Sequence, residues 1–194
     1  AGDAIAAALL ERAVEAVAVG VAQVRRGAVA VVVEAVAADL REEGRAPGVG
    51  VVAIELAARA VPVGVLDVDP QGSLGEWFEA RERRLGAEAA GFGFRTASGW
   101  GARREALGLQ RDYDFVVIDT PPKSDLEAKP AIEAATLVAI PIQPTPVDFW
   151  SSAATLKIVA KENVPALVVV NRVPARGLVT AEILSAIAEL GVDV

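Results

Sequence analysis

The chain has 194 residues, of which 53% are hydrophobic, and it carries a formal net charge of −7 at neutral pH. This length suits one domain, and a domain of this size can bury roughly 70% of its unfolded surface without covalent cross-links. The sequence holds no cysteine and no histidine, so disulfides, thiolate metal sites and histidine-based acid–base catalysis are excluded. The acidic balance argues against a surface that is basic all round, but it is compatible with a local basic patch.

The N-terminal region and the hydropathy profile predict where the protein resides. Residues 1–16 follow an amphipathic helix pattern and lack the basic start of a secretory leader. No apolar run approaches the ~20 residues that a membrane-spanning helix needs. We therefore expect a cytoplasmic protein with no membrane partner, in which residues 1–16 form a helical extension.

Strand patterns alternate with helix patterns along most of the chain. Short, β-branched apolar runs predict buried strands at residues 17–22, 63–66, 115–118, 137–142 and 166–170. Helix patterns lie between and after them, at residues 32–43, 74–84, 126–135, 147–162 and 180–190. A further strand is predicted within 91–98, and residues 46–60 form an extra segment before the strand at 63. This alternation predicts a single α/β domain over residues 1–194, with three layers and a mostly parallel sheet that has helices on both faces.

A pair of carboxylates follows the predicted strand at 63–66. Asp67 and Asp69 are separated by one residue, and a Pro-Gln-Gly turn and a helix pattern come next. Ligands of open parallel sheets bind beyond the carboxyl ends of the strands, so Asp69 is a candidate ligand-site residue. The alternative is that this aspartate only caps the following turn and helix. Position alone does not decide between these two interpretations.

Two later strand ends also carry polar residues. Asp119 follows the apolar run 115–118, which is the Walker B arrangement, in which a carboxylate holds Mg²⁺ through water. Asn171 follows the run 166–170, where its amide could contact a purine edge or could simply hold the next turn. Taken alone, each signal is weak, because strand ends often carry such residues.

In this order and spacing, the motifs resemble the ParA/MinD group of P-loop ATPases, and the small ParA-type partition proteins most of all. The matching stretches lie within residues 63–173 and are VGVLDVDPQGSLGEWFEAR, YDFVVIDTPP, LVAIPIQPTPVDFW and ALVVVNRV. The resemblance implies a P-loop NTPase-like fold and a homodimer that depends on ATP and Mg²⁺. It also implies a role in the segregation of DNA or another cargo, with non-specific DNA or a partition protein as partner. By the same resemblance, Asp69 would orient the attacking water, Asp119 would bind Mg²⁺ through water, and Asn171 would contact the adenine.

The phosphate loop of the family is the part that this sequence does not reproduce. That loop reads Lys-Gly-Gly-x-Gly-Lys-Thr and lies between the first strand and the first helix. Aligned on the flanking elements, Val24 and Val29 replace its two lysines and Ala30 replaces its threonine. A second candidate at residues 46–52 keeps two glycines, but it has Val51 in place of the second lysine and follows a helix pattern. Element order favours the first alignment.

Two functions therefore stay open. The first is a ParA-type partition or positioning ATPase with a degenerate phosphate loop, which the retained Asp69, Asp119 and Asn171 favour. The second is a non-catalytic pseudo-ATPase or redesigned interaction module, which the missing lysines favour. We expect ATP binding at least ten-fold weaker than in a lysine-bearing relative, since about 1.4 kcal/mol is already a factor of ten. On the favoured alignment, Val29→Lys with Ala30→Thr would restore binding and Val51→Lys would not.

Overall fold

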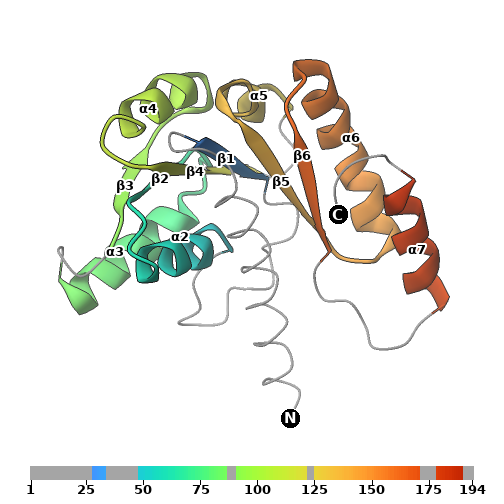
Figure 1. Ribbon diagram of the computed structural model, residues 1–194, viewed down its shortest axis with the longest axis horizontal. Coiled ribbons are helices and arrows are strands. Elements are labelled where there is room, and N and C mark those ends of the chain that lie inside the picture. The colour runs from blue at the N-terminus through green and yellow to red at the C-terminus, as the bar shows by residue number, and fades with distance from the viewer. Residues whose placement is uncertain (1–27, 34–47, 87–90, 122–124, 171–177, 190–194) are drawn as a thin grey trace, which may run out of the picture.

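A computed structural model of the chain describes residues 28–33, 48–86, 91–121, 125–170 and 178–189 (Figure 1). Within them, the strands form one sheet in the order β3-β2-β4-β1-β5-β6, and all of the described pairings are parallel. The strands are β1 (Ala28–Val33), β2 (Val63–Asp67), β3 (Gly93–Thr96), β4 (Phe115–Thr120), β5 (Leu137–Ile142) and β6 (Ala166–Val170). Parallel strands need crossover connections and cover on both faces, so helices must lie on both sides of this sheet.

The helices supply that cover in two groups. They are α2 (Gly48–Ala58), α3 (Ser73–Leu85), the short 3₁₀ turn η3 (Gly99–Gly101), α4 (Ala102–Leu109), α5 (Asp125–Ala134), α6 (Pro146–Glu162) and α7 (Leu178–Ala188). Helices α2 and α3 lie on one side of the sheet, and α4 and α5 lie on the other (Figure 1). This arrangement confirms the predicted three-layer α/β class.

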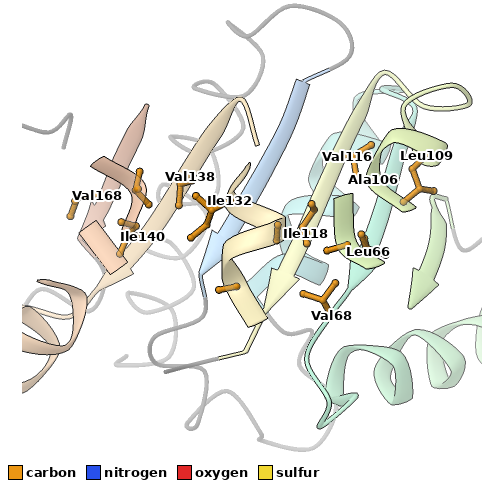
Figure 2. Close-up of a cluster of buried hydrophobic side chains, with 14 of the residues drawn as sticks. Leu66, Val68, Ala106, Leu109, Val116, Ile118, Ile132, Val138, Ile140 and Val168 are labelled. Carbon is orange, nitrogen blue, oxygen red and sulfur yellow. The ribbon is translucent and has the colours of Figure 1, made fainter. Parts of the chain in front are cut away.

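Alternate residues of the central strands enter two separate apolar clusters. Val116 and Ile118 of β4 join side chains from α4, α5, α6 and α7 in the first cluster (Figure 2). Phe115 and Val117 point the other way and join side chains from α2 and α3. Each fully buried aliphatic side chain stabilises the fold by about 1.5–3 kcal/mol. Burial on both faces explains why these strands read as unbroken apolar runs.

From residue 63 onward, the predicted elements match the structure closely. The strand predictions at 63–66, 115–118, 137–142 and 166–170 are confirmed as β2, β4, β5 and β6. The strand predicted within 91–98 is β3, at the edge of the sheet. The predicted helices correspond to α3, α5, α6 and α7, with ends that differ by a few residues.

The N-terminal assignments are different and need correction. The apolar run Ala28–Val33 is the strand β1, which pairs with both β4 and β5. Val29 pairs with Val116 and Ala30 pairs with Val117, so neither residue belongs to a phosphate loop. The helix predicted to start at Val32 is wrong there for the same reason. A six-residue run of Ala and Val suits a strand buried on both sides of a sheet.

Other N-terminal predictions either change or lie outside the described residues. Residues 46–60, expected as an extra segment, contain α2, which is the described element between β1 and β2. The predicted extension 1–16, the strand at 17–22 and Val24 fall outside the described residues.

Candidate functional site

The carboxyl ends of β2 and β4 bring the acidic residues together. These strands are parallel neighbours, and Asp67 is the register partner of Asp119. The Val68 amide donates a 3.0 Å hydrogen bond to the Asp119 carbonyl oxygen, which carries the pairing one residue past the end of β2. Asp69 follows directly, so Asp69 and Asp119 lie at the same edge of the sheet. Val32 of β1 pairs with Asp119 on its other side, so the central strand ends at this edge too.

Asp67 is anchored by two backbone amides, and it is only 2% exposed. Its Oδ1 accepts a 3.0 Å hydrogen bond from the Asp69 amide, and its Oδ2 accepts a 3.1 Å bond from the Gly75 amide. Gly75 lies in the first turn of α3, where amides have no partner within the helix. The residue before this helix is Gly72, which has no side chain to cap it. Asp67 therefore does the capping from the neighbouring strand.

Burial has an electrostatic consequence for the same side chain. Burial raises the pKa of the Asp67 carboxyl above its ordinary value, because a charged carboxylate loses its hydration. The Asp69 and Gly75 amides oppose this rise, while the negative charge of Asp69 adds to it. Sequence reasoning noted this aspartate but gave it no role. The sequence feature that could have indicated this role is the position of Asp67 at the end of a buried strand, just before a turn and a helix.

Asp69 occupies a different environment two residues further on. It is half-buried, and its Oδ1 accepts a 2.9 Å hydrogen bond from the Gln71 amide. Its carbonyl oxygen accepts a 3.0 Å bond from the Gly72 amide, which closes a tight turn. Gly72 has a φ of 65°, in the left-handed region that favours glycine. The turn-capping interpretation of Asp69 is thus realised, while its Oδ2 accepts no hydrogen bond within the described chain.

Asp119 is the predicted magnesium ligand, and the structure buries it to 3% exposure beside the fully buried Thr120. No cluster of three or more metal-ligating side chains occurs among the described residues. Mg²⁺ does not require such a cluster, because it is commonly held by one or two carboxylates, water and phosphate oxygens. The carboxylates of this edge are hard oxygen donors, so their chemistry fits Mg²⁺. The assignment of Asp119 to Mg²⁺ nevertheless remains a prediction.

The start of α2 lies in the context that the phosphate loop needs. Gly48 begins α2, and α2 connects toward β2 after the central strand β1. The family loop likewise lies between the first strand and the first helix, so residues 46–52 are the better match. The alignment that places Val29 and Ala30 in the phosphate loop is therefore wrong, while Val24 lies outside the described residues. On the alternative alignment, Val51 stands where the family has its second lysine. The error arose because two apolar runs precede this segment, and the later one forms the central strand.

An indole ring packs against this same turn of α2. A Cβ atom on Gly50 would lie 2.8 Å from Cζ3 of Trp77, a separation that real side chains do not adopt. Trp77 belongs to α3 and stacks on Phe92, with ring centroids 6.2 Å apart. The Arg81 guanidinium lies 6.0 Å from the Trp77 ring centroid. Packing alone therefore explains why a glycine stands at position 50.

The remaining predicted site residue is Asn171, which lies outside the described residues. Strand β6 ends at Val170 and runs parallel to β5, so the chain leaves β6 at the same edge as the acidic residues. The predicted contact between Asn171 and adenine stays a prediction. Among the described helices, none has both the length and the apolar character to cross a membrane.

Comparison with known proteins gives one sequence relative. No family model matches the chain. It is 31% identical over 140 residues to the maintenance of carboxysome distribution protein A of Halothiobacillus neapolitanus. That alignment covers 68% of this chain and 62% of the relative, so the chain spans somewhat less than two thirds of the protein that it matches.

Solved structures share the fold at low sequence identity. The MinD cell division protein of Aquifex aeolicus has a TM-score of 0.62 at 14% identity, over 86% of this chain and 80% of that one. A putative plasmid partition protein of Borrelia burgdorferi bound to AMPPNP has a TM-score of 0.61 at 16% identity, over 82% and 81%. The pNOB8 ParA bound to nonspecific DNA has a TM-score of 0.58 at 19% identity, over 84% and 75%. In fold the chain is similar to ParA- and MinD-type P-loop proteins, and its sequence is similar to the carboxysome distribution relative, which confirms the resemblance carried by its motifs.

Proposed function

We propose that this chain acts in the nucleotide-dependent positioning or segregation of a cargo, as a ParA-type protein. The observation that carries the proposal is the juxtaposition of Asp69 and Asp119 at one edge of the sheet, beside the end of β1. This edge is where open parallel sheets bind ligands. The name of the carboxysome distribution relative supports a positioning role.

Each part of the edge has a task under this proposal. Backbone amides at the start of α2 would face the phosphates, since the first amides of a helix lack internal partners. Asp119 would hold Mg²⁺ through water, and Mg²⁺ supplies positive charge to the β- and γ-phosphates. Asp69 would orient the attacking water, from a turn that Asp67 holds in place. Asn171 would contact the adenine.

The partners follow the same reasoning. A homodimer, with non-specific DNA or a partition protein as partner, remains our prediction, and we place the protein in the cytoplasm. The DNA bound by the pNOB8 ParA supports DNA as one partner. The AMPPNP bound by the Borrelia partition protein supports ATP as the nucleotide.

Nucleotide binding should nevertheless be weak, because Val51 replaces the lysine of the pattern. A hydrogen bond to a charged group contributes about 1.5–3 kcal/mol. Since about 1.4 kcal/mol corresponds to a factor of ten, we expect at least ten-fold weaker affinity for ATP than with lysine at this position. Hydrolysis should fall further, because the charge that develops on the γ-phosphate loses a nearby cation.

A second candidate function is a non-catalytic interaction module. The contact between Trp77 and Gly50 favours it, because it explains the glycine without any phosphate. Val51 favours it as well, since a valine supplies no charge to a nucleotide. In that case the acidic edge serves only to hold α3 and the turn before it.

Titration with AMPPNP and Mg²⁺ separates these functions. We expect Val51→Lys to bind at least ten-fold more tightly than the unchanged chain, as measured by isothermal calorimetry. The matched control is Ala57→Lys, which adds the same charge six residues further along α2. Val29→Lys is not expected to help, because Val29 lies within β1. Equal affinity of the unchanged chain and Val51→Lys would contradict the assignment, and no binding by either would favour the non-catalytic module.

The role of Asp69 is tested in the Val51→Lys background. Asp69→Asn should keep AMPPNP binding within about two-fold while ATP hydrolysis falls by about 100-fold, as expected for a group that directs the attacking water. Phosphate release and calorimetry measure the two quantities. A variant that loses binding and hydrolysis equally would show that Asp69 only shapes the turn.

A further inference from the structure

A stripe of large side chains follows the exposed face of η3 and α4 and continues into the turn after α4. The members share helical spacing and exposure, and they are Trp100, Arg103, Arg104, Leu107 and Arg111. Trp100 is 87% exposed and Leu107 is 51% exposed, so two of the few large apolar side chains at the surface lie here. Spacings of three, four and seven residues place side chains on one face of a helix. We call this set the α4 stripe.

The opposite face of α4 fixes the direction in which the α4 stripe points. Ala102 and Ala106 are fully buried, and Leu109 is 1% exposed. All three belong to the apolar cluster that includes Leu66 and Val116 of the sheet. A rotation of α4 that buried the α4 stripe would expose these three buried residues. The packing of α4 therefore keeps the α4 stripe at the protein surface.

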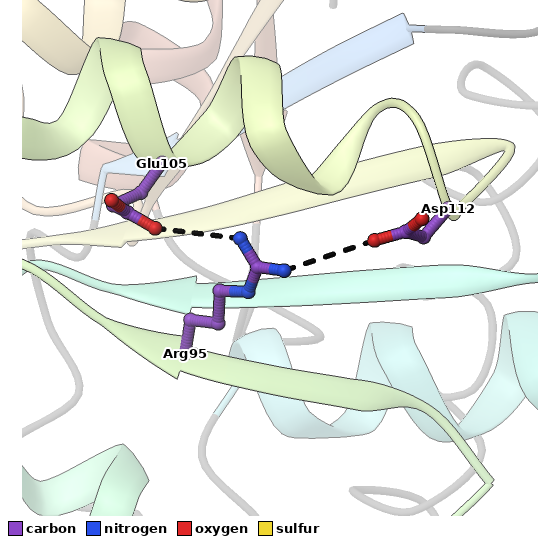
Figure 3. Close-up of polar contacts among 3 residues, drawn as sticks. All are labelled: Arg95, Glu105 and Asp112. Atoms are coloured by element: carbon purple, nitrogen blue, oxygen red, sulfur yellow. Dashed lines mark hydrogen bonds and ion pairs between the residues drawn. The ribbon is translucent and has the colours of Figure 1, made fainter.

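Two acidic side chains near the α4 stripe form ion pairs with an arginine that is not part of the stripe. Arg95 of β3 places Nη1 3.4 Å from Glu105 Oε2 and Nη2 3.7 Å from Asp112 Oδ2 (Figure 3). In the described part of the chain, no acidic side chain forms an ion pair with Arg103, Arg104 or Arg111. The α4 stripe is therefore a local cationic surface on a chain whose net charge is −7.

The composition of the α4 stripe selects a ligand chemistry. Guanidinium groups match phosphate oxygens through two parallel hydrogen bonds, and an exposed indole offers a flat face to a base. Arg103 and Arg104 lie near the start of α4, which is about 12 Å long, and Arg111 lies in the turn just past its end, so the three guanidinium groups span more than one phosphate of a DNA strand. Trp100 and Leu107 are two turns apart with arginines beside them. They do not form the contiguous apolar centre that a protein interface would need.

We propose that the α4 stripe is a DNA-contact surface. Arg103, Arg104 and Arg111 contact backbone phosphates, and Trp100 lies against a base or a sugar. Binding at this surface does not depend on the base sequence of the DNA, because phosphate contacts carry no base information. This inference deepens the proposed function by naming where its DNA partner binds, and to that extent it rests on that function.

The chain contains a matched control for this surface. Arg83-Arg84 of α3 and Arg103-Arg104 of α4 are both adjacent, exposed arginine pairs on helices. The α3 pair lies with the opposite helical layer and lacks a neighbouring exposed tryptophan. The comparison is therefore between Arg103→Gln/Arg104→Gln and Arg83→Gln/Arg84→Gln. The two double variants remove the same charge from the same chain.

Fluorescence anisotropy with a labelled duplex and with its single strand measures the effect, each with and without AMPPNP and Mg²⁺. At low salt, we expect the α4 double variant to bind DNA at least ten-fold more weakly than the unchanged chain. We expect its slope of log affinity against log salt to fall by about 0.9 per lost contact. The α3 double variant should stay within about two-fold on both measures. Trp100→Ala should weaken single-strand binding about ten-fold, and Trp100→Phe should retain it.

Several outcomes would overturn the inference. One is the absence of DNA binding by the unchanged chain at low salt, with and without nucleotide. Another is an equal loss in the two double variants, which would indicate only net charge. Binding of polyglutamate to the stripe in the absence of DNA binding would make it a protein-docking surface instead.

The calorimetric titration keeps this test separate from that of the proposed function. If Val51→Lys gains no affinity for AMPPNP while the α4 double variant alone loses DNA, the nucleotide function fails and the DNA surface stands. If Val51→Lys gains affinity but the two double variants do not differ, the inference fails by itself.

Discussion

The end of β2 and the start of α2 both match sequence patterns of a phosphate site, but different forces hold them. At the end of β2, a buried carboxylate accepts two backbone amides and ties the turn to α3. At the start of α2, an indole ring packs against Gly50, and Val49 and Val52 are buried in the apolar cluster below. Hydrogen bonds to a carboxylate hold the first region, and apolar packing holds the second. A glycine inside a motif can therefore be required by packing, while an aspartate can be required by the backbone.

The largest expected effect on stability comes from the hydrogen bonds that Asp67 accepts at the end of β2. Asp67→Ala leaves two amides without their acceptor, and each buried unsatisfied group costs about 1–3 kcal/mol. We expect the free energy of unfolding to fall by about 2–4 kcal/mol, measured by urea denaturation. Asp69→Ala is the control, because it loses only one exposed bond and should cost less than about 1 kcal/mol. Equal losses of unfolding free energy in the two variants would show that the buried bonds of Asp67 contribute no more than the exposed bond of Asp69.

A smaller effect on stability is expected from the packing of Trp77 against Gly50 at the start of α2. Gly50→Ala forces the Trp77 ring to shift, and overpacking of this kind costs about 1–3 kcal/mol. The control is Gly75→Ala in the first turn of α3, where the nearest atoms to an added Cβ are 3.7 Å away or more. That change should be neutral or stabilising, since alanine is the better helix former. Trp77→Leu should remove most of the cost of Gly50→Ala, in a double-mutant cycle of urea midpoints.

The smallest expected effect is a dependence on pH that belongs to Asp67. Burial raises the pKa of this carboxyl in the folded protein, so the folded state holds its proton to higher pH than the unfolded chain does. The contribution of this group to stability is therefore full below the unfolded value. It is lost as pH rises from there through the folded value, at no more than about 1.4 kcal/mol per pH unit. Urea midpoints at a series of pH values measure this loss, and Asp67→Asn should remove its part of the slope. A slope of the opposite sign would show that the amide bonds outweigh burial.

Much of the fold could be predicted from sequence, because its signals are local. The strands β2, β4, β5 and β6 are unbroken β-branched runs, which only a sheet covered on both faces accommodates well. Their parallel order then places Asp69 and Asp119 at one edge without any knowledge of side-chain contacts. The motif spacing carried the family resemblance for the same reason, since each motif directly follows a buried strand.

The tertiary structure decided what local pattern could not. The runs at 17–22 and 28–33 are alike in composition, and only pairing with β4 and β5 makes Ala28–Val33 the central strand. That choice moved the candidate phosphate turn from Val29 to the start of α2. Whether a carboxylate caps a helix or faces a ligand is also non-local, because one of the two amides that donate to Asp67 lies eight residues away on α3. Sequence determined which residues end the strands, and packing determined what each of them does there, because strand pairing and burial join segments that no local pattern connects.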